Sequence, residues 1–81
     1  MEQKNATILI VEDEADVLKT NSRMMKRRGY NVITAMNEKE CLERLGECTP
    51  DMLVLDIMLP DGNGYDICEK FRRRSDNPVI F

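Results

Sequence analysis

The chain has 81 residues, 42% of them hydrophobic and 33% charged, with a formal net charge of −3, which is typical of one small globular domain. The net negative charge and the absence of a long apolar run argue against direct nucleic-acid binding and against a membrane span. The absence of histidine, together with three cysteines that form no C-x-x-C pair, argues against a zinc site and against Cys/His or Ser/His catalysis.

The N-terminal residues suggest the cellular compartment that we expect for the protein. Residues 1–5 lack the apolar stretch of a signal peptide, so we expect a cytoplasmic protein. The cysteines at 41, 48 and 68 are then expected to be reduced and half-buried. We interpret the six methionines as core filler.

The first predicted strand is the β-branched run at 7–11, which is apolar at successive positions, as in a strand covered on both faces. It ends in the acidic residues 12–14. A helix is predicted over 15–28, because acidic residues lie in its first turn and basic residues in its last, which suits the helix dipole. Gly29 is the expected C-terminal stop. The inner face of this helix is predicted to carry Leu18, Ser22 and Met25.

A second strand is predicted at 31–35. The spacing of Asn37 and Glu40 is that of a capping box, which predicts the start of a second helix, and Gly46 is expected to end it. The inward residues of this helix are predicted to be Cys41, Leu42 and Leu45.

The third predicted strand covers 51–56 and is apolar until it ends in Asp56. The composition of 60–64 predicts a loop, a third helix follows at about 65–73, and a fourth strand begins at 78–81. Alternation of strands and helices predicts an α/β fold with a parallel sheet, right-handed crossovers and helices on both faces. We expect a single domain over 1–81 that is incomplete at its fourth strand.

Two of the apolar strands end in carboxylates. Glu12 and Asp13 follow the first strand, and Asp56 ends the third. Ligands of open α/β sheets bind outside the carboxyl ends of the strands, so three carboxylates converge there if these strands are neighbours. Such a cluster favours a hard cation such as Mg²⁺, because like charges repel one another without one. A carboxylate beside Mg²⁺ can also attack phosphorus.

Two segments carry a resemblance to a known family: ILIVEDE at 8–14 and LVLDIMLPDGNG at 53–64. They resemble the two signatures of response-regulator receiver domains of bacterial two-component systems, and the similarity extends over essentially the whole chain, including Gly29-Tyr30. The resemblance implies a flavodoxin-like parallel sheet of strand order 2-1-3-4-5, in which the first and third strands are neighbours.

The resemblance also implies roles for individual residues. Asp56 would accept a phosphoryl group from a histidine kinase, and output would pass through a partner or an attached domain. The implied Mg²⁺ ligands are the side chains of Glu12, Asp13 and Asp56 and the backbone carbonyl of Met58. Pro60 and Gly64 would shape the loop after the acceptor. The chain would be a phosphoacceptor domain rather than an enzyme, although family members catalyse their own phosphotransfer and dephosphorylation.

Family members carry Ser or Thr after the fourth strand and Lys after the fifth, and this sequence ends at Phe81, before either position. We therefore expect a receiver domain truncated before its fifth strand. Its fourth strand would be an exposed edge and one sheet face would lack a helix, which predicts a homo-oligomer, with domain swapping as one route to it. The alternative function is thus an assembly unit without productive phosphorylation.

Three further readings are weaker. A phosphatase-like hydrolase with Asp56 as nucleophile would need a second acid at Met58. A Ca²⁺ loop beginning at Asp61 would need Gly at the sixth position and Glu at the twelfth, where this sequence has Asp66 and Arg72. The basic residues within 70–74 suit the end of a helix better than a nucleic-acid surface.

Overall fold

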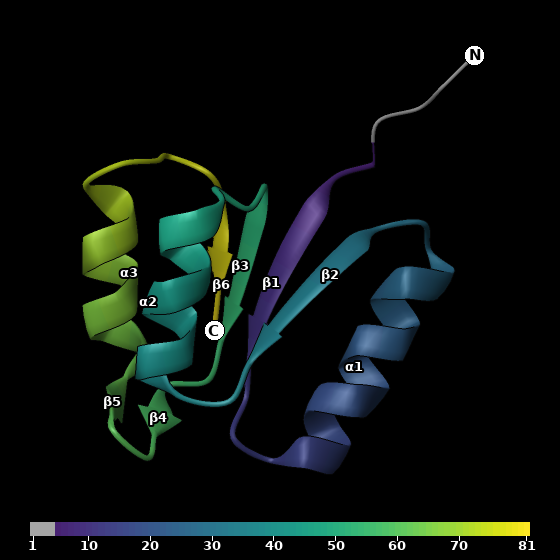
Figure 1. The fold of residues 1–81 in the computed structure, drawn as a ribbon, viewed down its shortest axis with the longest axis horizontal. Coiled ribbons are helices and arrows are strands. Elements are labelled where there is room, and N and C mark those ends of the chain that lie inside the picture. Colours follow the sequence, from purple (N-terminus) through teal and green to yellow (C-terminus); the bar gives the residue numbers. More distant parts are fainter. Residues whose placement is uncertain (1–4) are drawn as a thin grey trace.

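A computed structural model describes residues 5–81 and shows an α/β fold with one parallel sheet (Figure 1). The strands of this sheet lie in the order β2–β1–β3–β6, which confirms the predicted fold class and the adjacency of the first and third strands. They are β1 (Thr7–Val11), β2 (Asn31–Ala35), β3 (Met52–Leu55) and β6 (Val79–Ile80). The helices are α1 (Ala15–Arg27), α2 (Glu38–Glu47) and α3 (Gly64–Arg72).

Residues 1–4, on which the expectation about a signal peptide partly rests, lie outside the described part. Within the described residues, no helix has the length and apolar character needed to cross a bilayer.

The sheet has a separate apolar core on each face, because alternate residues of a strand point in opposite directions. Leu9 and Val11 of β1 pack with buried residues of α2 and α3, whereas Ile8 and Ile10 pack with Leu18 of α1. Figure 1 shows the same division, with α2 and α3 on one side of the sheet and α1 on the other. Full burial of each such side chain contributes about 1.5–3 kcal/mol.

The C-terminus of α1 is the glycine stop that the sequence predicts. Gly29 has a φ of 94°, a left-handed conformation that glycine adopts without strain. The amide of Tyr30 donates to the Met25 carbonyl (3.2 Å) and the amide of Gly29 to the Lys26 carbonyl (3.0 Å), which is the Schellman arrangement.

The start of α2 agrees with the predicted capping residues. Asn37 Oδ1 accepts a hydrogen bond from the amide of Glu40 (2.8 Å), and Glu40 Oε1 accepts one from the amide of Met36 (2.8 Å). The prediction that Gly46 ends the helix is wrong, because α2 continues to Glu47 and the backbone becomes extended only at Cys48.

Three other predictions are corrected by the structure. The predicted loop at 60–64 is instead the turn and second strand of a small antiparallel hairpin of β4 (Met58–Leu59) and β5 (Gly62–Asn63), and α3 begins directly after it, at Gly64. The methionines are not uniformly core filler, since Met24, Met36 and Met58 are 42%, 37% and 77% exposed. The cysteines are free, as expected, but Cys41 is fully buried rather than half-buried.

Candidate metal and phosphoacceptor site

The site lies at the carboxyl edge of the sheet, where β1 and β3 end side by side. The two strands are parallel and in register, with Val11 opposite Leu55. Glu12 and Asp56, the next residue of each strand, therefore emerge at the same edge. The amide of Asp56 still bonds to the Val11 carbonyl (3.1 Å), so the backbone is held up to the point where the carboxylate begins.

Three carboxylates meet at this edge. One oxygen each from Glu12, Asp13 and Asp56 lie within 4.8 Å of one another. Glu12 and Asp56 are half-buried and Asp13 is exposed. The structure thus brings together the three acidic side chains that the sequence placed at one edge.

The fourth predicted ligand, Met58, lies two residues after Asp56, at the start of β4. Its amide donates to Asp56 Oδ1 (3.3 Å), so the main chain of Met58 is tied to the proposed acceptor. Its side chain is 77% exposed and takes no part in the acidic cluster.

The pKa of Glu12 is raised above its usual value. Loss of solvation on burial is the largest cause, and the negative charges of Asp56 and Asp13 add to it. A hydrogen bond from the amide of Glu14 to Glu12 Oε1 (3.1 Å) acts in the opposite direction. Ionised Glu12 is therefore under electrostatic stress that a bound cation would relieve.

A pocket of about 300 Å³ adjoins the acidic cluster, and Glu12 and Asp56 contribute to its wall. Its other lining residues are Ile10, Val11, Asn21, Val54, Leu55, Ile57 and Phe81. Asn21 was not predicted, although one signal was available: it is an amide three residues after the buried Leu18, at a position that helical spacing turns towards the sheet.

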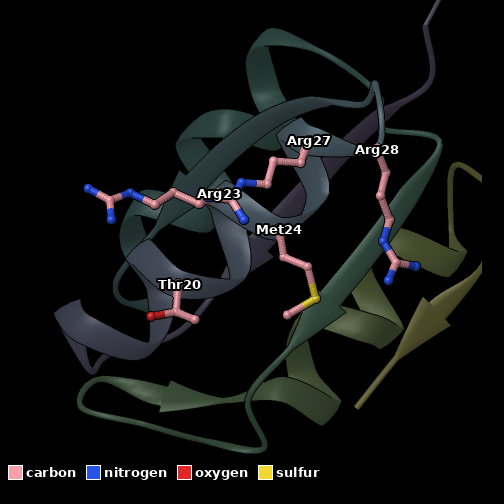
Figure 2. Close-up of a pocket in the computed structure, with 5 residues that line it drawn as sticks. All are labelled: Thr20, Arg23, Met24, Arg27 and Arg28. Atoms are coloured by element: carbon pink, nitrogen blue, oxygen red, sulfur yellow. The ribbon is translucent and has the colours of Figure 1, made fainter.

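A larger hollow of about 430 Å³ lies elsewhere, over the outer part of α1 (Figure 2). It is lined by Thr20, Arg23, Met24, Arg27 and Arg28. Figure 2 shows the guanidinium groups of Arg23 and Arg28 pointing away from each other, on either side of Met24. Because these two groups do not converge and none of the described lining residues is acidic, the hollow lacks the carboxylate chemistry of the strand-end site.

The loop after Asp56 depends on a glycine. A β-carbon on Gly64 would lie 2.6 Å from the carbonyl oxygen of Asp56 and 3.3 Å from the Cα of Ile57. The amide of Gly64 donates to the Ile57 carbonyl (2.8 Å), which holds the start of α3 against this segment. Pro60 is exposed, in the turn between β4 and β5.

One contact of this loop was not predicted from the sequence. The carboxylate of Asp61 accepts hydrogen bonds from the first two amides of α2, those of Glu38 (2.7 Å) and Lys39 (3.0 Å). These residues are more than 20 positions apart in the chain, so no local pattern could reveal the contact.

Comparison with known proteins identifies the family. The sequence model of the response regulator receiver domain matches residues 8–81. Among curated relatives, the probable transcriptional regulator ycf27 of Porphyra purpurea is 39% identical over 80 residues, which cover 99% of this chain and 33% of that protein. The alkaline phosphatase synthesis transcriptional regulatory protein PhoP of Bacillus subtilis is 37% identical over 70 residues, covering 86% and 29%. The chain therefore spans about a third of the length of these relatives.

Solved structures agree with this assignment. The non-phosphorylated HemR receiver domain from Leptospira biflexa has a TM-score of 0.85 and 32% identity, covering 93% of this chain and 61% of that one. The response regulator TrrA from Thermotoga maritima, solved in complex with Mg²⁺ and BeF, has a TM-score of 0.83 and 27% identity, covering 93% and 65%. The sequence match, the strand order and these structures lead to one conclusion: the chain belongs to the response regulator receiver domain family.

Proposed function

We propose that this chain is a phosphoacceptor domain in which Asp56 takes a phosphoryl group from a histidine kinase in a Mg²⁺-dependent reaction. The observation that carries the proposal is the convergence of oxygens from Glu12, Asp13 and Asp56 within 4.8 Å at the carboxyl edge of the sheet. The proposed setting is the cytoplasm, and the proposed output is through an attached domain or a partner, as the curated relatives are described as transcriptional regulators.

The donor set suits Mg²⁺. Carboxylate and carbonyl oxygens are the ligands that this hard cation prefers, and a partly exposed cluster lets it keep several waters. The pKa of Glu12 is raised chiefly by burial, and the negative charges of Asp56 and Asp13 in the same cluster raise it further, which agrees with a place where a cation would be favoured. Glu12, Asp13, Asp56 and the carbonyl of Met58 would hold the ion, which would supply neutralisation of the charge on a transferring phosphoryl group.

One hydrogen bond supports the proposed role of Asp56 as the nucleophile. Oδ1 accepts a hydrogen bond from the amide of Met58, which fixes the carboxylate and leaves the other oxygen available. In the proposed step, that oxygen forms a bond to phosphorus as the bond between phosphorus and the histidine nitrogen of the kinase breaks. The phosphoryl group moves to the carboxylate, and the electron pair of the broken bond stays on the imidazole.

The proposal is tested by intact mass spectrometry after incubation with acetyl phosphate and Mg²⁺. The wild-type chain should gain one phosphoryl group, and Asp56→Asn should gain none. Asp76→Asn removes a carboxylate from an exposed position outside the cluster and should behave as the wild type does. Equal labelling of Asp56→Asn, or labelling that is unchanged when the metal is chelated, would contradict the proposed mechanism.

A second candidate function, self-assembly, is favoured by a different observation. Among the described residues, β6 is paired on one side only, with β3, and Ile80 and Phe81 are 50% and 52% exposed. An unpaired strand edge with apolar side chains can pair with a second copy. Light scattering at high concentration should then show an oligomer of this chain that Asp56→Asn retains and Ile80→Lys disrupts. A monodisperse monomer would rule the candidate out.

A further inference from the structure

The hairpin that follows Asp56 is fastened at both ends. Its strands pair Met58 with Asn63 and Leu59 with Gly62, which leaves Pro60 and Asp61 as the turn. At the base, the amide of Met58 donates to Asp56 Oδ1 and Asn63 Oδ1 accepts from the amide of Asp66 (2.9 Å), capping α3. At the tip, the carboxylate of Asp61 reaches the N-terminus of α2.

The contact at the tip completes the capping of α2. The first amides of a helix have no partner within the helix. Asn37 serves only the third of them, that of Glu40 (2.8 Å). The first two, those of Glu38 and Lys39, donate to Oδ1 and Oδ2 of Asp61 at 2.7 and 3.0 Å. Each oxygen of the carboxylate thus accepts one bond at the positive end of the helix dipole, where an anion is favoured.

The pKa of Asp61 is lowered, chiefly by the hydrogen bonds from the amides of Glu38 and Lys39. The direction of this shift agrees with the geometry, because hydrogen bonds to the charged form of a carboxyl group favour that form.

The contact of Asp61 with α2 matters for the main chain of Met58, because the Met58 side chain is too exposed to fix that main chain in position. That side chain is 77% exposed, whereas the neighbouring Leu59 is buried in the core shared with α2 and α3. The position of the Met58 carbonyl therefore depends on the hairpin as a whole, through Leu59, the contacts at the base and the contact of Asp61 with α2.

We propose that Asp61 is a positioning residue that, by fastening the hairpin tip to the N-terminus of α2, holds the main chain of Met58 where the metal site needs it. This inference rests on the function proposed above, and it adds to that function a residue outside the acidic cluster. It also makes α2 a support for the site, although α2 contributes none of the proposed ligands.

Two plainer explanations of the same contact must be separated from this one. Asp61 could act only as a helix cap, which would stabilise α2 without affecting the metal site. Its negative charge could also attract a cation from a distance, whatever the hairpin does. The test therefore needs a variant that breaks the contact and keeps the Asp61 carboxylate.

Glu38 provides such a variant. Glu38→Pro removes the amide that donates to Asp61 Oδ1, and proline is well tolerated at the first position of a helix. The preceding residue, Asn37, is extended, with φ −157° and ψ 174°, a conformation compatible with a following proline. Glu38→Ala is the matched control, because it removes the same carboxylate and keeps the amide. Asp61→Asn complements the pair, since its amide nitrogen cannot accept the bond from Lys39.

The measurement is a Mg²⁺ titration of each full chain followed by NMR, with amide hydrogen exchange recorded for the hairpin and for α2. We expect Asp61→Asn to weaken Mg²⁺ binding about tenfold, the lower end of what loss of a supporting contact costs a metal site. Glu38→Pro should bind about threefold more weakly than Glu38→Ala, with faster exchange in the hairpin.

Two different results would contradict the inference, and they distinguish its failure from the failure of the metal site. If Glu38→Pro and Glu38→Ala bind Mg²⁺ equally and only the amides of α2 exchange faster, Asp61 is a helix cap and the inference is overturned while the metal site stands. If the wild-type chain shows no Mg²⁺-dependent shifts at Glu12, Asp13 and Asp56, the proposed site itself is wrong, and the inference falls with it.

Discussion

Gly64 lies directly against the main chain of Asp56, so closely that a β-carbon at this position would be 2.6 Å from the Asp56 carbonyl oxygen. The first residue of α3 and the proposed phosphoacceptor thus share one tightly packed segment of backbone. The absence of a side chain at Gly64 is what allows α3 to begin there, and the amide of Gly64 adds a hydrogen bond to the Ile57 carbonyl (2.8 Å).

Replacement of this glycine should therefore destabilise the fold. We expect Gly64→Ala to lower the free energy of unfolding by about 1–3 kcal/mol, because the added carbon must displace backbone atoms. Gly46→Ala is the control, since its β-carbon would meet nothing within 4 Å and the residue lies inside α2. That variant should gain about 0.5–1 kcal/mol from helix propensity. Urea unfolding of both variants checks the prediction, and a Gly64→Ala protein as stable as the wild type would contradict it.

The ionised side chain of Glu12 should lower the free energy of unfolding when no metal is bound. Its pKa is raised in the folded state, so the folded state holds the proton more tightly than the unfolded state does, and ionisation above this pKa disfavours folding. Glu12→Gln should be more stable than the wild type near neutral pH, by at most about 1 kcal/mol because the site is partly solvated. The unfolding free energies of the two proteins should converge below pH 4.5, the ordinary pKa of a glutamate side chain.

Addition of Mg²⁺ should reverse this order. The wild-type chain should gain stability on binding the ion, and Glu12→Gln should gain less, because it lacks one proposed ligand. Urea unfolding with and without Mg²⁺ gives both comparisons. Equal stabilisation of the two proteins by Mg²⁺ would exclude Glu12 as a ligand.

Asp61 should contribute stability that disappears in acid. Its folded-state pKa is depressed below 3.8, so its contribution is complete above that value and is lost as the pH falls through the lower, folded-state pKa. The wild-type chain should therefore be more stable than Asp61→Asn near neutral pH, and the difference should shrink as the pH falls below 3.8. Urea midpoints of both proteins over this range test it. A difference that is independent of pH would mean that the ionised carboxylate is not what holds α2.

Cys41 should be the least reactive thiol of the folded chain. Burial, and to a smaller extent the charge of Glu38, raise the pKa of this thiol to about 12. At about pH 8 only about one molecule in ten thousand would carry the thiolate. Alkylation with iodoacetamide followed by peptide mapping should modify Cys48 and Cys68 in the native chain and Cys41 only after denaturation. Rapid labelling of Cys41 under native conditions would contradict its burial.

The acidic cluster could be predicted from sequence because it depends on topology. Continuous apolar runs ending in acidic residues at Glu12 and Asp56 indicate buried parallel strands, and the carboxyl ends of parallel strands lie at one edge of the sheet. The strand order was available only from the resemblance to receiver domains, since alternation alone does not fix which strands are adjacent. The metal ligands and the phosphoacceptor role remain predictions that the experiments above address.

The hairpin at 58–63 could not be predicted, for a physical reason. Strands of two residues are too short to show an alternating pattern, and turn-forming residues dominate the segment. The contact of Asp61 with Glu38 and Lys39 involves main-chain donors, which carry no side-chain signature in the sequence. The prediction that Gly46 ends α2 failed for a related reason. A helix ends where the backbone changes conformation, and a glycine can adopt a left-handed conformation without being forced into one.

The division of the core between the two faces of the sheet has a consequence for how the sequence can change. Ile8 and Leu9 are consecutive residues of β1, yet the first packs with α1 and the second with α2 and α3. Substitutions in the two packing groups share few partners, so their effects on unfolding free energy should be close to additive. The α1 side can accordingly change in sequence at little cost to the α2–α3 side. The strand-end acids, in contrast, depend on β1 and β3, which contribute residues to both packing groups, so changes on either side of the sheet can reach the acidic cluster.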